Sequence, residues 1–301
     1  MPMPPDVSEA AQRSAQLVTD GRTLTDLIKT LRREPSVAVD IESNGFHRYP
    51  ERVCLVQLAS RNECYIVDPL AIDDMAPLGR LLEDESIQKV LHGPDYDLRS
   101  LDREWGFRIR NLYDTSVAAH LVGLERRGLA AASEHFLGVI LKKEKRLQRA
   151  DWSLRPLSQA ALSYAANDVA YLLQLRDAIV ARLASLGRTD WALEESARLE
   201  GLRYAAPEPP ERAYLSMKGS RALDGRGLAV LKELVVLRER EARRLGRPPF
   251  RVLSDRPLLF LAANPRADLA QTPGVGAPAL RRMGNGIRKA LKDGMASDPV
   301  K

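Results

Sequence analysis

Four acidic residues and one tyrosine have the types and spacing needed to hold a pair of divalent metal ions. Asp40 and Glu42 lie two residues apart at the end of an apolar run, Asp97 follows another such run, and Tyr164 and Asp168 lie four apart in a helical pattern. Carboxylates at the ends of apolar elements are costly unless a cation neutralises them. Two Mg²⁺ or Mn²⁺ ions about 4 Å apart would do so, and would catalyse in-line hydrolysis of a phosphodiester. The pattern therefore predicts a metal-dependent nuclease.

Each of these residues, taken alone, also has a structural explanation. Asp40 could cap the turn that follows through residues 43–45, and Asp97 could stabilise the dipole of the helix that it begins. Tyr164 could be a core aromatic residue, and Asp168 a solvated surface acid. Only the joint order and spacing of the five residues carry the metal hypothesis.

Composition places the chain among globular proteins of two domains. The 301 residues exceed the usual size of one domain, and a hydrophobic content of 45% is enough for a sizeable core. Cys54 and Cys64 fall in predicted strands without a paired or metal-binding spacing, which is typical of buried cysteines in a reducing cytoplasm. Residues 1–16 lack the basic and apolar regions of a signal peptide, and no apolar run approaches the roughly 18 residues that span a bilayer. We expect a cytoplasmic protein that does not enter a membrane.

The charge is distributed unevenly along the chain. Residues 201–301 hold 20 basic and 10 acidic residues, a net charge of +10, whereas the remainder holds 26 basic and 30 acidic residues, a net charge of −4. An acidic part that bears the candidate carboxylates is thus followed by a basic part. This asymmetry favours a polyanion that the basic part binds and the acidic part cuts, although a charged soluble surface would give the same numbers.

The apolar pattern predicts a mixed β-sheet with helices on both faces, an α/β architecture. Five segments read as strands because they are short, apolar and β-branched; they are residues 36–41, 53–59, 64–67, 89–92 and 108–112. Helical spacing is found over residues 75–82, 97–105 and 158–179.

A second, all-helical domain is predicted after a proline-rich linker at residues 202–211. Residues 223–244 form a long amphipathic helix, and shorter helices follow it. We therefore divide the chain into four parts; they are an N-terminal extension (1–20), a catalytic domain (21–201), the linker (202–211) and a helical domain (212–295).

The sequence motifs resemble those of the ribonuclease D group of 3′–5′ exonucleases, the tyrosine variant of the DEDD superfamily. The resemblance covers about residues 20–200. It rests on the motifs Val39-Asp40-Ile41-Glu42, His92-Gly93 through Asp97, Asp151 to Leu157 and Tyr164 to Val169, and also on Gln57 and Leu137-Gly138-Val139. It implies a ribonuclease H-like fold. The helical domain resembles the HRDC module shared by RecQ-type helicases and ribonuclease D, at residues 248–255 and 281–284.

The resemblance also implies roles for the five residues. Asp40, Glu42 and Asp168 would hold the metal ion that lowers the pKa of the attacking water, and Asp40 with Asp97 would hold a second ion against the leaving 3′-oxygen. Tyr164 would orient the water. The expected cofactors are therefore two divalent metal ions, Mg²⁺ or Mn²⁺.

A few other polar residues have two interpretations. His92 could donate to a phosphate or sugar, but a histidine at a strand end is more often a structural hydrogen-bonding group. Arg155 could contact the backbone of a single strand. The densest basic patch of the helical domain, where phosphate contacts would make binding salt-dependent, consists of Arg243, Arg244, Arg247 and Arg251.

The leading hypothesis is a 3′–5′ exoribonuclease that releases nucleoside 5′-monophosphates during 3′-end processing of tRNA-type precursors. We expect it to act as a monomer on nucleic acid with a free 3′ end. Three alternatives stay open: a DNA exonuclease of Werner type, a catalytically inactive nucleic-acid-binding protein, and a metal-dependent phosphatase. Recognition of the 2′-hydroxyl separates RNA from DNA, and no motif reports it.

Overall fold

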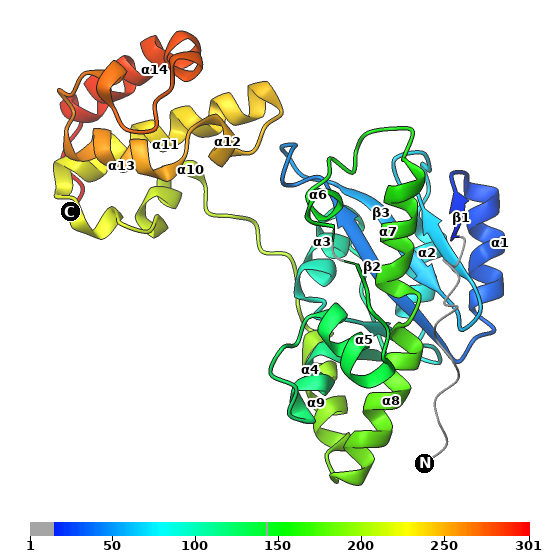
Figure 1. The fold of residues 1–301 in the computed structure, drawn as a ribbon. Coiled ribbons are helices and arrows are strands. Elements are labelled where there is room, and N and C mark those ends of the chain that lie inside the picture. Colours follow the sequence, from blue (N-terminus) through cyan, green and yellow to red (C-terminus); the bar gives the residue numbers. More distant parts are fainter. Residues whose placement is uncertain (1–14, 143) are drawn as a thin grey trace. The chain divides into compact units, whose positions relative to one another are not determined.

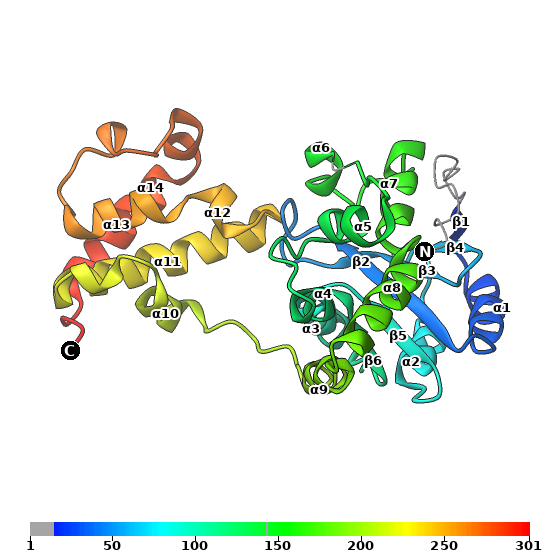
Figure 2. The ribbon, with the colours of Figure 1, turned by 60° about the horizontal axis from the view of Figure 1, so that its bottom comes forward.

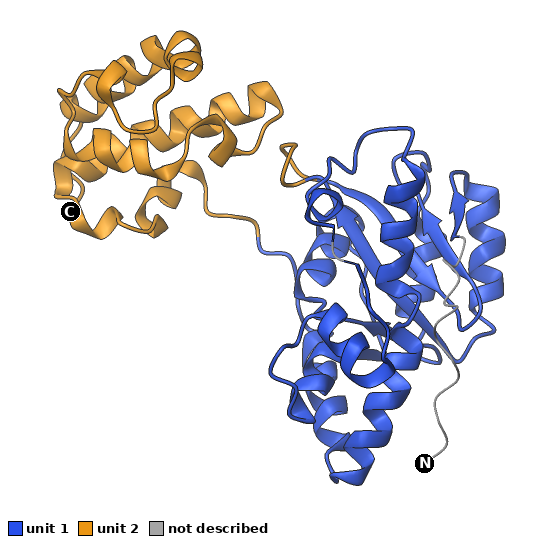
Figure 3. Cartoon of the chain, viewed as in Figure 1, with its two compact units in different colours: residues 1–44, 52–205 blue, residues 45–51, 206–301 orange. Residues whose placement is uncertain are grey.

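The computed structural model describes residues 15–142 and 144–301, which form two compact units. Unit 1 comprises described residues 15–44 and 52–205, and unit 2 comprises residues 45–51 and 206–301 (Figure 3). The chain enters unit 2 at residue 45, returns to unit 1 at residue 52, and passes to unit 2 again at residue 206. No helix in the described part of the chain is long and apolar enough to cross a membrane.

Unit 1 is built on one six-stranded sheet of mixed direction (Figure 1). In spatial order the strands are β1 (Ala15–Val18), β4 (Cys64–Val67), β3 (Val53–Ala59), β2 (Ser36–Ser43), β5 (Gln88–Leu91) and β6 (Leu112–Asp114). β2, β3 and β4 pair antiparallel, whereas the other three pairs are parallel. The predicted mixed sheet is confirmed.

Helices cover both faces of this sheet because its central strands are apolar on both sides. Alternate side chains of β2 enter different cores, so that Val37, Val39 and Ile41 pack with residues of the first three helices, whereas Ala38 packs with residues of the helices that follow β6. Figures 1 and 2 show this layered arrangement. The helices are α1 (Gly21–Leu31), α2 (Ala76–Glu83), α3 (Asp95–Trp105), α4 (Thr115–Leu121), α5 (Leu129–Leu137), α6 (Lys145–Gln148), α7 (Gln159–Val169), α8 (Leu172–Ser185) and α9 (Thr189–Leu199).

Two predicted elements of unit 1 are placed wrongly. The strand expected at residues 108–112 instead spans Leu112–Asp114, because Asn111 has a left-handed φ of 51° and breaks the extended run before pairing with β5 begins. The single helix expected at residues 158–179 is two helices, α7 and α8, because Tyr171 leaves the helical region with φ −119° and ψ 1°.

The predicted N-terminal extension, residues 1–20, lies mostly outside the described residues. Its described part contains strand β1, which the sequence did not predict. Only Val18 of this strand is buried, so its apolar pattern is weak, and its structure depends on parallel pairing with β4.

Unit 2 is helical, as predicted. It consists of α10 (Pro210–Ala213), α11 (Gly225–Leu245), α12 (Pro249–Val252), α13 (Asp255–Ala263), α14 (Ala277–Ala296) and the 3₁₀ turns η2 (Tyr214–Ser216), η3 (Ser220–Ala222) and η4 (Leu269–Gln271). The Asp224 carboxylate caps α11 by accepting from the Gly227 amide at 2.7 Å, and Gly246 ends the helix with a φ of 59°. Leu231 and Leu234 of α11 enter a core shared with α13 and α14.

Segment 45–51 belongs to unit 2 although it follows strand β2 in sequence. The Tyr49 amide donates to the Gly246 carbonyl at 3.2 Å, and the Tyr49 ring packs against the core of this unit. The local sequence pattern did not indicate this placement.

Candidate active site

Strand β2 carries Asp40 and Glu42 to the same side of the sheet. Residues two apart on a strand point the same way, and both acids share the face of Ala38, which is the face that α7 covers. The regular pairing of β2 with β3 shifts between Glu42 and Ser43. A shift of this kind bends the strand and is common beside active sites.

Helix α3 supplies Asp97 from the neighbouring part of the sheet. β5 turns into this helix through Gly93, whose φ of 65° suits glycine and whose amide donates to Asp114 Oδ1 at 2.8 Å. Asp97 lies in the first turn of α3 and is only 9% exposed. A short connection thus fixes a buried carboxylate directly after a buried strand.

Helix α7 supplies Tyr164 and Asp168, which lie one turn apart. Ser158 caps the helix by accepting from the Ala161 amide at 3.1 Å. Three of the four buried residues of α7 are alanines, Ala161, Ala165 and Ala166, so the helix can lie close to β2, β3 and β4. The side chains of Tyr164 and Asp168 remain partly exposed.

The structure brings all five residues into one electrostatic cluster. Burial raises the pKa of Asp40 well above its ordinary value, and the negative charges of Asp97, Asp168 and Glu42 raise it further. Burial, then Asp168 and Asp97, raise the pKa of Glu42 to about 9. The phenol of Tyr164 has a raised pKa for the same reasons, with burial first and Asp168, Glu42 and Asp40 after it.

Asp97 has a second acidic neighbour that the sequence motifs did not single out. Burial raises the pKa of Asp97 to about 7, and the charge of Asp114 acts in the same direction. Asp114 is itself held, since one carboxylate oxygen accepts from the amides of Gly93 and Ser116, both at 2.8 Å. Its hydrogen bonds make Asp114 a structural residue that positions the start of α3.

The acids fit a divalent ion by the chemistry of their donors. Carboxylate oxygens are the donors that Mg²⁺ and Mn²⁺ prefer, and a cation would remove the mutual repulsion that raises these pKa values. Within residues 15–142 and 144–301, no three Asp, Glu, His or Cys side chains already have the spacing of ligands around one ion. The mutual effects of these acids on their pKa values show that their charges act on one another.

Comparison with known proteins decides which family has this arrangement. The family model described as 3′–5′ exonuclease matches residues 15–184, and the model of the HRDC domain matches residues 227–291. A ribonuclease D of Gluconacetobacter diazotrophicus is 37% identical over 290 residues, which cover 94% of this chain and 73% of that protein. The chain belongs to the ribonuclease D family of 3′–5′ exonucleases.

Solved structures of this family have the same fold. The catalytic core of RRP6 from Trypanosoma brucei matches with a TM-score of 0.83 and 28% identity, covering 95% of this chain and 81% of that chain. RNase D of Escherichia coli, described as an exoribonuclease involved in structured RNA processing, matches with a TM-score of 0.76 and 28% identity, covering 94% of this chain and 76% of that chain. The expected exonuclease fold and the helical HRDC region are confirmed.

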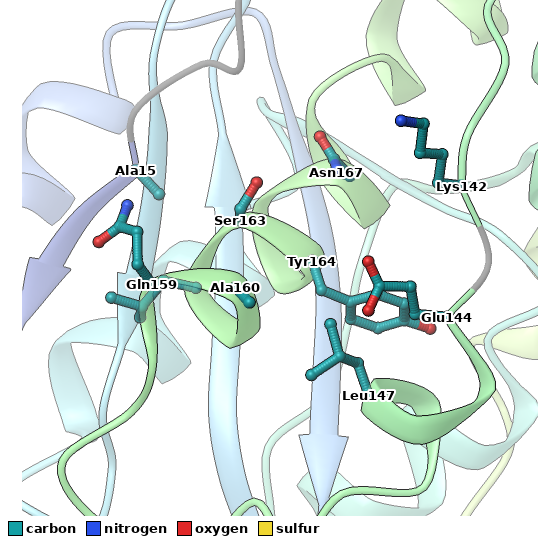
Figure 4. A pocket seen from close by; sticks show the side chains of 10 residues that line it. Ala15, Lys142, Glu144, Leu147, Gln159, Ala160, Ser163, Tyr164 and Asn167 are labelled. Carbon is teal, nitrogen blue, oxygen red and sulfur yellow. The ribbon is translucent and has the colours of Figure 1, made fainter.

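A cavity of about 420 Å³ adjoins the exonuclease site beside Tyr164 (Figure 4). Gln159, Ser163 and Asn167, spaced four residues apart along α7, line one part of it, and Lys142 and Glu144 line another. A much smaller cavity next to it is lined by both Tyr164 and Asp168. Polar side chains therefore line part of the cavity on the exposed side of α7.

Two residues with open interpretations have structural roles in this exonuclease. His92 Nδ1 lies 2.9 Å from Thr115 Oγ1, and its Nε2 lies 2.7 Å from the Arg127 carbonyl oxygen. The Arg155 guanidinium donates to both oxygens of Asp68, at 2.5 and 2.7 Å, and to the Cys54 carbonyl at 3.0 Å. The hypothesis that Arg155 contacts a nucleic-acid backbone is not supported, because this forked pair already uses its donors.

Proposed function

We propose that this exonuclease removes nucleotides one at a time from the 3′ end of RNA and releases nucleoside 5′-monophosphates. The observation that carries the proposal is the convergence of Asp40, Glu42, Asp97, Tyr164 and Asp168 from three separate elements. Burying such acids together without a cation would only lower the stability of the fold. The choice of RNA follows the ribonuclease D relatives.

Four carboxylates would hold two divalent ions, Mg²⁺ or Mn²⁺: those of Asp40, Glu42, Asp97 and Asp168. When bound, such ions supply an activated water and neutralise the charge that develops on the phosphate. Asp40 would contribute to the positions of both ions, because the charges of the other three acids all raise its pKa. Losing its charge should therefore disturb the whole cluster.

Tyr164 would hold the attacking water through its hydroxyl. Its raised pKa means that the phenol stays protonated across the physiological range and can donate a hydrogen bond. The ring is kept in place by Trp152, whose ring centre lies 6.1 Å away and whose side chain is buried. The phenol thus has a fixed position beside the acids without being a base.

The helical unit would bind the nucleic acid upstream of the cut. It contains the matched HRDC domain, and residues 201–301 carry a net charge of +10, whereas the rest of the chain carries −4. Phosphate contacts by its arginines would be independent of sequence. We propose that the substrate is a structured precursor of tRNA type, that the linker spans residues 202–211, and that the enzyme acts as a monomer.

The test is a trimming assay with 3′-end RNA and DNA oligomers of the same sequence, in Mg²⁺, Mn²⁺ or chelator. We expect a ladder that shortens from the 3′ end of RNA and disappears with chelator. Asp40→Asn should lower the rate at least about 1,000-fold, since the ions lose a shared ligand, while binding of the oligomer is kept.

Asp26→Asn is the matched control, because Asp26 is an exposed acid of α1 whose carboxylate pairs with Lys29 at 3.0 Å. Its trimming rate should equal that of the unaltered protein. Trimming of DNA alone would replace the RNA assignment with a DNA exonuclease, and trimming at full rate by Asp40→Asn would remove Asp40 from the site.

A further inference from the structure

Gln57, in the middle of β3, is a buried side chain whose polar atoms have no use in the described structure. Its exposed fraction is 0%, and neither Nε2 nor Oε1 has a hydrogen-bond partner among the described residues. A buried amide without partners costs stability, so an apolar side chain of the same size would suit this position better. Packing of the core therefore does not explain why a glutamine occupies this position.

Within the sheet, the neighbours of Gln57 on its face include one polar side chain. Along β3, the residues on the same face are Leu55 and Ala59, which are apolar and buried. Across the sheet, Gln57 is paired with Ile66 of β4 on one side and with Asp40 of β2 on the other. Of these four neighbours, Asp40 alone has a polar side chain.

Their direct opposition in the sheet puts the two side chains within reach of each other. Directly opposed residues of an antiparallel pair have Cβ atoms about 4.5–5.5 Å apart and point to the same face. The long Gln57 side chain can therefore place its NH₂ group next to the Asp40 carboxylate. A charged acceptor is the strongest partner that a buried amide can have.

We propose that Gln57 is a positioning residue that holds the ionised Asp40 carboxylate in its metal-binding orientation by donating a hydrogen bond from Nε2. This inference rests on the proposed metal-dependent function. The unpaired amide lowers the stability of the protein without ions, and the hydrogen bond forms when Asp40 turns toward a bound cation. Gln57 is thus expected to lower stability and to increase metal affinity.

The experiment compares the full-length protein with Gln57→Met, a change that keeps side-chain length and removes both polar atoms. In chelator, Gln57→Met should unfold at the same temperature or a few degrees higher. Its affinity for Mn²⁺, measured from the free-ion EPR signal, should fall about 10- to 100-fold, the effect of one hydrogen bond to a charged group. Trimming should recover toward the normal maximum rate as Mn²⁺ is raised, which a merely distorted core would not allow.

Tyr113→Phe is the matched control, because the Tyr113 hydroxyl is also buried without a partner among the described residues but lies on β6. It should leave Mn²⁺ affinity unchanged. Equal Mn²⁺ affinity in Gln57→Met and the unaltered protein would overturn the role of Gln57 alone. If the unaltered protein binds no Mn²⁺ and trims without it, the proposed metal site fails as well, so the two failures are distinguishable.

Discussion

Lys89 and Asp40 show how burial has opposite meanings for two charged residues. Lys89 is fully buried on β5, and its Nζ donates to the backbone carbonyls of Asp84 and Ile87 at 2.5 and 2.6 Å. Its contacts are all structural, and burial lowers its pKa to about 8. The partners of Asp40 are other acids, so its burial makes sense only with a cation.

The pH dependence of stability should reveal Lys89. Its pKa is near 10.5 in the unfolded chain and about 8 in the fold, so between these values the unfolded chain holds the proton that the folded protein has lost. Stability should therefore rise with pH from about 8 to 10.5, and the cost should be constant below 8. Lys89→Met should lack this rise when thermal unfolding is followed across the range. Equal pH profiles for both proteins would contradict the lowered pKa.

Tyr164→Phe should separate orientation of the water from its activation. The change removes one hydroxyl and keeps the ring that packs near Trp152. We expect kcat for RNA trimming to fall about 10- to 100-fold, the effect of losing roughly 1.4–2.7 kcal/mol of transition-state stabilisation. KM and the affinity for Mn²⁺ should not change. A loss as large as that of Asp40→Asn would mean that the hydroxyl does more than position the water.

At the scale of elements, the site depends on how closely α7 approaches the sheet. Ala165 is fully buried on the face of α7 that meets the sheet, one residue after Tyr164. Small residues on that face set the distance between the helix and β2, and therefore between Asp168 and Asp40. The proposed metal site thus depends on helix packing as well as on its ligands.

Ala165→Leu should therefore damage both stability and catalysis. Overpacking of a filled core costs about 1–3 kcal/mol, and here the strain would push α7 away from β2. Chemical denaturation should show the loss of stability, and trimming should need more Mn²⁺ to reach half its maximum rate. Ala181→Leu, on an exposed position of α8, is the matched control and should change neither property.

At the scale of the whole molecule, the uneven distribution of charge along the chain matters more for RNA binding than the number of charged residues. The predicted basic patch on unit 2 is partly neutralised within the unit, since Arg243 pairs with Glu239 at 2.9 Å and Arg244 pairs with Glu241 at 2.7 Å. Exposed pairs of this type are weak and can open to a phosphate. The net charge of residues 201–301 stays strongly positive.

Binding of single-stranded RNA should therefore weaken steeply as salt rises. Each phosphate contact contributes about 0.7 to the slope of log affinity against log salt concentration for a single strand. Arg244→Ala together with Arg247→Ala should reduce the slope by about 1.4 if both residues contact phosphates. Arg198→Ala, in α9 of unit 1 and paired with Glu194 and Glu195, should leave the slope unchanged. An unaltered slope in the double variant would place the phosphate contacts elsewhere.

Local patterns in the sequence were sufficient to predict the mixed sheet, its helices on both faces and the helical second unit, and they indicated the five candidate site residues. Apolar periodicity and motif spacing depend on residues that are close together in the sequence, so they can be recognised without a structure. The roles of the four acids and Tyr164 came from the family resemblance, and they stay predictions until the variants are measured.

Tertiary structure alone decided the features that depend on distant parts of the chain. Strand β1 forms because it pairs with the edge of β4. Segment 45–51 joins unit 2 through Tyr49. The helix predicted at residues 158–179 is broken at Tyr171. In the sequence, Gln57 is one polar residue of a family motif. The fold places it opposite Asp40, with no other polar neighbour in the sheet. Burial and pairing arise only when the chain closes on itself, because they are relations between residues that are far apart in the sequence.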